Sequence, residues 1–323
     1  MTMAKDLVIA NGSTTAAKPV EGLWFEDGNL ILKAENSLFK IYSGLLAARS
    51  SVFRDMLAFP PPPEGNTMVD GCPIVTVYDS AKDMGYFLMA VFDTSYFEPP
   101  PVQTELPIVE GVLRLSLKYD VQYLRRRALQ HLLSTFPTTL KDWKQRDTQR
   151  TIPPVDNTPF AAFRLARQFD LAWLLPSILY CISSHPFEKT LDRSTWGTEE
   201  ITLSWPDKRM CILGRQKIVM KQTQNALKMM KLASTNVDGC TSEMCASTRQ
   251  RCAHVLGDWD MAGMLDYFED NADMYFSGFC TQCRVAFKDL CASECQDMWN
   301  ELPSMFDLPS WDVLEDLRGK SLD

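Results

Sequence analysis

The stretch FKIYSGLLAARSSVFRDML, residues 39–57, is the part of the sequence that decides the fold. It is rich in Leu, Ala, Ser and Phe, and it contains neither a metal-ligand motif nor a glycine-rich loop. Residues 43–50 predict a short helix. Ser50 then predicts the start of a second helix over 51–57, because a serine hydroxyl accepts hydrogen bonds from the free N–H groups of a first turn. A stretch of this kind predicts packing rather than chemistry.

The segments on either side predict a mixed unit of strands and helices. LWFEDGNLILKAENSLFKIY (23–42) predicts a β-hairpin with its turn at residues 35–37. The prolines at 60–63 end the second helix, and PIVTVYD (73–79) predicts a further strand because it is β-branched. A capping pair, Ser80 and Asp83, opens the next helix. Apolar spacing predicts helices over 83–92, 108–119 and 121–136.

Taken together, these segments resemble a BTB/POZ domain. That family begins with an acidic residue before a strand, followed by F-x-x-H-x-x-x-L-x-x-x-S-x-x-F. Residues 75–97 resemble the family's third strand with its following helix, and residues 111–132 resemble its last helical pair. The resemblance covers residues 22–136 in the right order. The residues that match the opening motif are Asp27, Phe39, Leu45 or Leu46, Ser50 and Phe53.

The resemblance implies a domain that joins protein chains. In this family the helices after the first hairpin build both the core and a dimer face, so the chain is expected to form a homo- or hetero-dimer. Phe39, Leu46 and Phe53 either fill the core of one chain or lie in that dimer face. Their periodic spacing favours the core, because large apolar residues with this spacing are usually buried.

The sequence departs from the family pattern at two points. Tyr42 stands where the family has His, and Ser43 stands where a basic residue is common. In some members that basic residue and the acid equivalent to Asp27 form a charged pocket for corepressors, and Ser43 cannot supply the charge. Members that recruit a cullin often carry an apolar-x-Glu motif after the second helix, and AFPPPPEGN (58–66) fits this motif poorly.

The rest of the chain predicts a second, mostly helical part. We expect a flexible leader over 1–21, a polar linker with prolines over 137–159, and a helical Cys-rich domain over 160–323. Within that domain, residues 160–184 predict two helices broken near Pro176, and residues 208–233 predict another. The expected fold class is therefore α+β, an N-terminal BTB/POZ-like α/β domain followed by a mostly α-helical C-terminal domain.

This second part resembles the C-terminal half of large fungal BTB families. The resemblance rests on LARQFDLAWLLPSILY (165–180) and on a closing pattern, W-x-x-L-P-x-x-F-x-L-P-x-W, that follows a Cys pair. The residues in the closing pattern are Trp299, Leu302, Pro303, Phe306, Leu308, Pro309 and Trp311.

Seven of the ten cysteines fall between residues 240 and 295. Two close pairs, Cys240 with Cys245 and Cys280 with Cys283, predict a structural zinc site, because four thiolates in a tetrahedral array bind zinc strongly and close its coordination shell. Reduced cysteines are also common buried residues, so core thiols remain an equal alternative, and disulfides a lesser one. The pair Cys291 and Cys295, and Cys252 with His254, are weaker ligand candidates.

Charge and hydropathy exclude several classes of partner. The net charge is −8, and residues 258–323 carry 15 acids and 4 bases. Nucleic-acid binding requires clustered Lys and Arg, and the only tight basic run, residues 125–127, has the spacing of a solvated helix face. No segment has the ~18 apolar residues of a membrane span, and residues 1–17 lack the apolar region of a signal peptide. We expect neither nucleic acid nor membrane as partner, and an intracellular protein, cytoplasmic or nuclear, with reduced cysteines.

No catalytic motif is present, and His131, His185 and His254 are far apart in sequence. The leading hypothesis is a non-enzymatic module for protein–protein interaction, dimerising or scaffolding through residues 22–136. The alternatives are a substrate adaptor of a cullin-type ubiquitin ligase, a zinc-containing transcription regulator and a thiol enzyme. An apolar-x-Glu cullin contact would favour the first, a basic patch beside the cysteines the second, and a selectively labelled cysteine the third.

Overall fold

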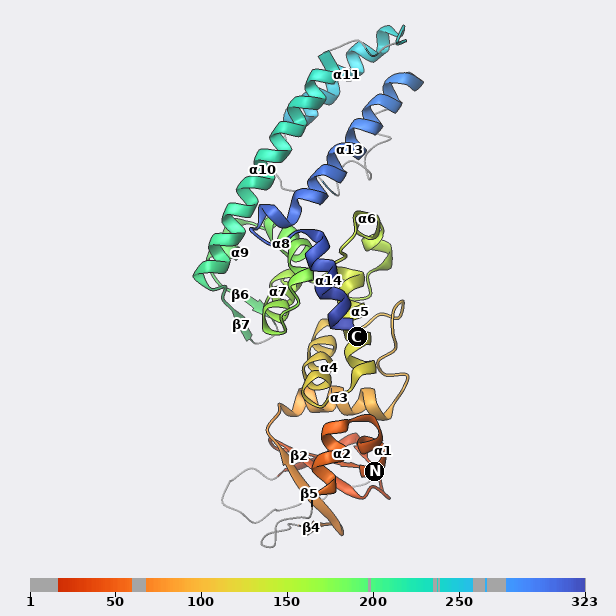
Figure 1. Ribbon diagram of the computed structural model, residues 1–323, viewed down its shortest axis with the longest axis vertical. Coiled ribbons are helices and arrows are strands. Elements are labelled where there is room, and N and C mark those ends of the chain that lie inside the picture. Colours follow the sequence, from red (N-terminus) through yellow and green to blue (C-terminus); the bar gives the residue numbers. More distant parts are fainter. Residues whose placement is uncertain are drawn as a thin grey trace. The chain divides into compact units, whose positions relative to one another are not determined.

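The computed structural model is an α+β fold, with a five-stranded sheet in the N-terminal part and helices in the C-terminal part (Figure 1). It divides into two compact units, residues 1–135 with 149–153 and 322, and residues 136–148 with 154–321 and 323. The residues that the structure describes are 17–59, 68–196, 199–234, 237, 239–257, 265 and 277–322.

The sheet of the first unit has the strand order β1-β3-β2-β5-β4. Strands β2 and β3 form the predicted hairpin, in which Ala34 pairs with Ser37 across a turn where Glu35 has a left-handed φ of 49°. Strand β2 lies inside the sheet, and Leu30 to Leu32 and Ala34 are all buried. The strands are β1 (Lys18–Trp24), β2 (Leu30–Ala34), β3 (Ser37–Ile41), β4 (Met68–Val69) and β5 (Cys72–Val77).

The predicted leader is too long. Residues 18–21 belong to strand β1, which pairs in parallel with β3 through Lys18 with Ser37 and Pro19 with Leu38. The partner strand lies about twenty residues away, so no local pattern revealed this pairing. Ala17, just before β1, is buried, and residues 1–16 of the predicted leader lie outside the described residues.

Five helices follow the predicted order in the first unit. Ser50 caps α2 by accepting a hydrogen bond from the Phe53 N–H at 3.0 Å, and Ser80 caps α3 by accepting one from the Asp83 N–H at 3.0 Å. Both serines are the caps that the sequence predicts, because each lies just before an apolar-periodic run. The helices are α1 (Ser43–Arg49), α2 (Ser51–Ala58), α3 (Ala81–Phe92), α4 (Leu106–Lys118) and α5 (Gln122–Thr135).

The second unit is mostly helical, with one small hairpin. The two predicted helices with a break near Pro176 are confirmed, because α7 ends at Gln168 and α8 begins at Leu175, with Pro176 in its first turn, where it removes no helical hydrogen bond. The elements are α6 (Leu140–Gln149), α7 (Thr158–Gln168), η1 (Ala172–Leu174), α8 (Leu175–Ser183), α9 (Phe187–Leu191), β6 (Ser194–Trp196), β7 (Glu199–Ile201), α10 (Trp205–Ser234), α11 (Glu243–Gly257), α13 (Thr281–Met305) and α14 (Trp311–Leu322).

Helix α6 lies within the segment that the sequence predicts as a linker. Its two apolar residues, Leu140 and Trp143, are three positions apart, so both face one side and are buried. The Trp143 ring packs 5.4 Å from the ring of Tyr180 and 5.6 Å from that of Trp299, measured between centroids. The polar composition of the segment gave no indication of this contact. Residues 140–148 are part of the second unit rather than a linker.

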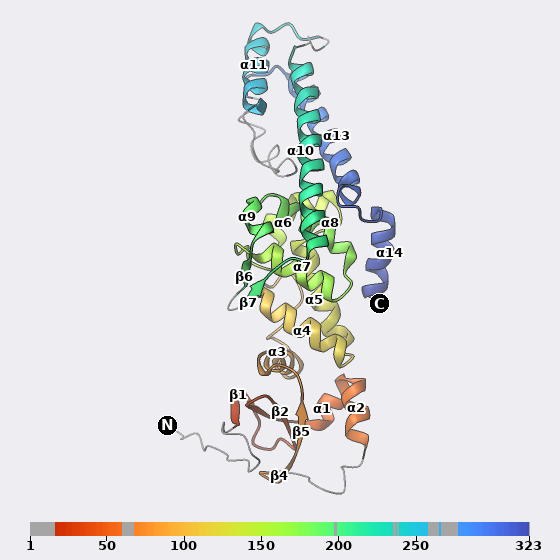
Figure 2. The same cartoon turned by 90° about the vertical axis from the view of Figure 1, so that its left-hand side faces the viewer.

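Helices α10 and α13 lie side by side in both views of the second unit (Figures 1 and 2). Two ion pairs join them, Lys221 with Glu301 at 2.6 Å and Lys228 with Glu294 at 2.7 Å, and Lys217 pairs at 2.7 Å with Asp307, just beyond the end of α13. Partner numbers fall along α13 as they rise along α10, so the two helices are antiparallel. The end of α10 and the start of α13 are thereby brought to the same end of the helix pair.

Candidate metal centre

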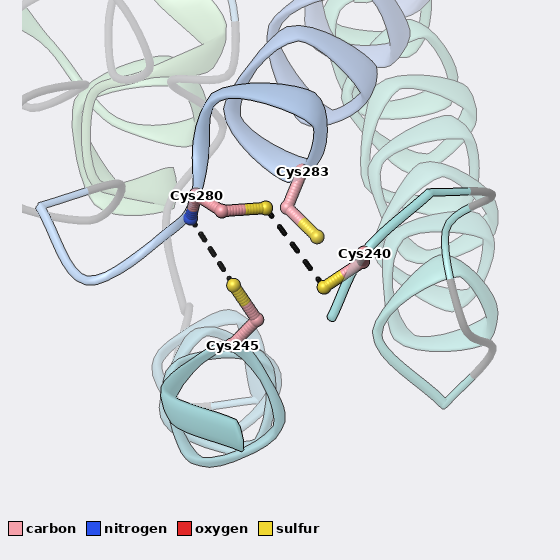
Figure 3. Close-up of side chains that lie close together, drawn as sticks. All are labelled: Cys240, Cys245, Cys280 and Cys283. Atoms are coloured by element: carbon pink, nitrogen blue, oxygen red, sulfur yellow. Dashed lines mark hydrogen bonds between the residues drawn. The ribbon is translucent and has the colours of Figure 1, made fainter. Parts of the chain in front are cut away.

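Four cysteine sulfurs gather at that end of the second unit (Figure 3). The Sγ atoms of Cys240, Cys245, Cys280 and Cys283 all lie within 4.8 Å of one another. These are the two pairs that the sequence singles out, and the fold brings them together. They are the one group of three or more possible metal ligands found among the described residues.

Two helix starts position the four sulfurs. Cys245 lies in the first turn of α11 and Cys283 in the first turn of α13, while Cys280 occupies the N-cap of α13. Cys240 comes from the segment before α11, where Gly239 has a left-handed φ of 78°. The start of a helix carries a partial positive charge, so two such starts favour negatively charged sulfur between them.

Hydrogen bonds also connect the four residues. The Cys280 N–H donates to the sulfur of Cys245 at 3.1 Å, and the Cys280 thiol donates to the sulfur of Cys240 at 3.8 Å (Figure 3). The pKa of Cys240 is lowered to about 7, first by a hydrogen bond with the Ser242 backbone and then by one with Cys283. Burial, reinforced by hydrogen bonds with Cys240 and Cys280, raises the pKa of Cys283 to about 12. One thiolate therefore forms readily among these thiols, whereas all four require a bound cation to offset their charge.

The spacing of the sulfurs fits one tetrahedral metal ion. Metal–sulfur bonds of about 2.3 Å place tetrahedral sulfurs about 3.8 Å apart, so a small contraction of the observed cluster completes the geometry. An iron–sulfur cluster is larger, because its outer sulfurs lie on either side of two or more irons. Four protein ligands fill a zinc shell and leave no position for a reacting water. Such a site can stabilise a fold but cannot activate a substrate.

A close approach of the chain to α11 shapes this site. A Cβ atom added at Gly278 would overlap the Oγ1 atom of Thr248 on α11 and come within 3.3 Å of its Cβ. Glycine therefore lets the segment that ends in Cys280 lie directly against α11, where Cys245 is located. The sequence alone did not indicate this glycine, because its partner lies thirty residues earlier.

We expect Gly278→Ala to destabilise the second unit by about 1–3 kcal/mol, the usual cost of forcing a methyl group into a packed contact. Thermal unfolding of the full-length chain measures the change. Thr248→Ala removes the overlapping atoms, so the double variant should recover much of the loss. Gly319→Ala is the control, because a Cβ there meets nothing within 4 Å. Additive effects of the first two substitutions would contradict the close contact.

The weaker ligand candidates lie elsewhere or outside the described side chains. Cys291 and Cys295 are buried along α13 and are not part of the sulfur cluster. The side chains of Cys252 and His254 are outside the described residues. None of the nine cysteines whose side chains the structure describes forms a disulfide bond.

In the first unit, the residues of the predicted motif lie in and beside the core. Phe39, Leu46 and Phe53 are completely buried, whereas Leu45 is 38 % exposed, so Leu46 fills the core position of the motif. The Ser50 hydroxyl caps α2 and also donates to the Tyr119 carbonyl at 2.5 Å.

Tyr42 and Asp27 meet at the surface. The Tyr42 hydroxyl donates a hydrogen bond to the Asp27 carboxylate at 2.5 Å, and this bond raises the pKa of Tyr42. The Ser43 N–H donates to the side chain of Asn29 at 2.8 Å. The carboxylate of Asp27, which the resemblance places in a corepressor pocket, is therefore hydrogen-bonded to the phenol of Tyr42.

One residue near the sulfurs was missed by the sequence analysis. Arg249 on α11 is 6 % exposed, and its Nη1 atom lies 3.7 Å from the sulfur of Cys283 and 4.0 Å from that of Cys240. It follows Cys245 by four positions, which places both on one face of a helix. This spacing could have identified Arg249 from the sequence, but only if Cys245 was already known to face the cluster.

Comparison with known proteins gives no relative. No protein-family model, no curated protein and no solved structure matches this chain. Among the residues that the structure describes, none of the helices combines the length and the hydrophobicity that a membrane span requires.

Proposed function

We propose that this chain is a protein-interaction module without catalytic activity. Its first unit, similar to a BTB/POZ domain, pairs two copies of the chain. Its second unit is a mostly helical unit in which a structural zinc ion holds the starts of α11 and α13 together. The mechanism is the burial of apolar helix surface between chains.

The proposal that two chains pair rests on the exposed apolar surface of α1 and α2. Of the fifteen residues in these two helices only Leu46 and Phe53 are buried. Leu45 is 38 % exposed, Val52 39 %, and Phe59, immediately after α2, 75 %. Large apolar side chains that remain exposed on one helix pair are typical of a protein-binding surface.

The order of elements supports the BTB/POZ-like proposal. The family resemblance implies a hairpin, two short helices, a strand, a helix and a final helical pair, and β2 to α5 follow that order with β4 added. The buried positions of Phe39, Leu46 and Phe53 agree with the same resemblance.

The sulfur cluster supports the zinc proposal. Cys240, Cys245, Cys280 and Cys283 would be the four ligands, and the ion would join the start of α11 to the start of α13. Because binding energy at such a site is also folding energy, the ion would give this end of the unit a fixed surface.

Sedimentation velocity of the full-length chain at micromolar concentration tests the pairing. We expect a dimer, since a specific interface buries more than about 1,000 Å², and we expect Leu45→Asp to produce a monomer. Leu191→Asp is the matched control, because Leu191 is a leucine of the second unit with 43 % exposure. A monomeric parent chain, or a dimer that tolerates Leu45→Asp, would contradict the proposal. A monomer that binds the N-terminal region of a cullin in calorimetric titration would instead be a ubiquitin-ligase adaptor.

A further inference from the structure

Arg249 is a buried charged side chain that lies beside the sulfur cluster. It is 6 % exposed, and its guanidinium faces the sulfurs of Cys283 and Cys240 at 3.7 and 4.0 Å. Burying a charge is costly unless charged or strongly polar groups accompany it. A neutral thiol is only a weak hydrogen-bond acceptor, whereas a thiolate accepts a hydrogen bond from a guanidinium strongly.

Metal binding would supply those thiolates. Four cysteine thiolates around one divalent ion carry a net charge of −2, and a hydrogen-bond donor with a positive charge lowers the cost of burying it. The Cys280 N–H already donates to the sulfur of Cys245 at 3.1 Å. Arg249 places a donor beside two of the remaining sulfurs.

We propose that Arg249 is a positioning residue of the metal site, which donates hydrogen bonds to the metal-bound thiolates of Cys240 and Cys283 and lowers their negative charge. This inference rests on the metal site of the proposed function. The guanidinium fixes the two sulfurs from outside the coordination shell and reduces their reactivity toward electrophiles. Partners of this kind usually affect metal affinity 10–100-fold.

The test compares the parent chain with Arg249→Met and Arg249→Lys, each loaded with Co²⁺ as a spectroscopic probe and with Zn²⁺ for affinity. Met preserves the length of the side chain without charge or donors, whereas Lys preserves the charge. Arg251→Met is the matched control, since Arg251 lies on the same helix and is exposed.

We expect Arg249→Met to weaken Zn²⁺ binding by about 10–100-fold in competition with a chelator. The sulfur-to-cobalt charge-transfer band should move to lower energy, because sulfur electrons without hydrogen bonds are less stabilised, and iodoacetamide should alkylate the zinc-bound thiolates faster. Arg249→Lys should restore part of each property, and Arg251→Met should behave as the parent.

Two results would overturn the proposal in different ways. If the parent binds Co²⁺ and the Met and Lys variants give its band position, affinity and alkylation rate, Arg249 has no role at the site although the site exists. If the parent itself takes up neither ion, the metal site fails and the role of Arg249 fails with it. Should Arg249→Met not fold, the band position of Arg249→Lys decides.

Discussion

We expect Cys283→Ser to abolish stoichiometric zinc binding and to unfold the end of the second unit that holds the sulfurs, while the first unit stays folded. The sulfur of Cys283 is fully buried within the cluster, and a hydroxyl is a poor replacement for a thiolate ligand of zinc. Structural zinc sites contribute about 10–16 kcal/mol of apparent binding free energy, so loss of the ion should unfold the segments that it joins.

Hydrogen exchange followed by mass spectrometry measures the effect segment by segment. Protection should be lost over residues 239–257 and at the start of α13, and kept in the sheet of the first unit. Cys291→Ser is the matched control, because Cys291 is a buried cysteine of the same helix outside the cluster. Equal loss of zinc in both variants, or unchanged protection in Cys283→Ser, would contradict a structural metal site.

Phe53→Ala should lower the free energy of unfolding of the first unit by about 3–5 kcal/mol, the usual cost of removing a buried aromatic ring. The Phe53 ring is completely buried and stacks on Tyr119, with 4.2 Å between ring centroids. Tyr119 in turn lies 5.7 Å from Phe87 on α3. Removing Phe53 therefore leaves a cavity beside the ring of Tyr119.

Urea unfolding, followed by a signal from the first unit, measures this change. Tyr78→Ala is the control, because Tyr78 is an aromatic residue of the same unit that is 95 % exposed, and its loss should change stability by no more than about 0.5 kcal/mol. Similar effects of the two substitutions would show that the stretch 39–57 does not contribute to the core in this way.

Much of the first unit could be predicted from the sequence because its signals are local. Ser50 and Ser80 lie one residue before helices and accept hydrogen bonds from N–H groups of their first turns, and the hairpin needs only two turn residues, Glu35 and Asn36, between two apolar runs. The pairing of β1 with β3 and the burial of Trp143 in α6 could not be predicted, because each depends on a partner distant in sequence.

The candidate site also combines features that the local sequence predicts with features that depend on residues distant in sequence. Close spacing singled out Cys240 with Cys245 and Cys280 with Cys283, since each pair is local. The convergence of the pairs depends on the antiparallel packing of α10 with α13, which the ion pair of Lys228 with Glu294 helps to align. No local sequence pattern predicts how α10 packs against α13.

Native mass spectrometry of the full-length chain, purified without chelator, tests the central claim most directly, because one spectrum reports both subunit number and metal content. The account predicts a dimer that carries one zinc ion per chain. A monomer with no metal and four alkylatable thiols at Cys240, Cys245, Cys280 and Cys283 would contradict it.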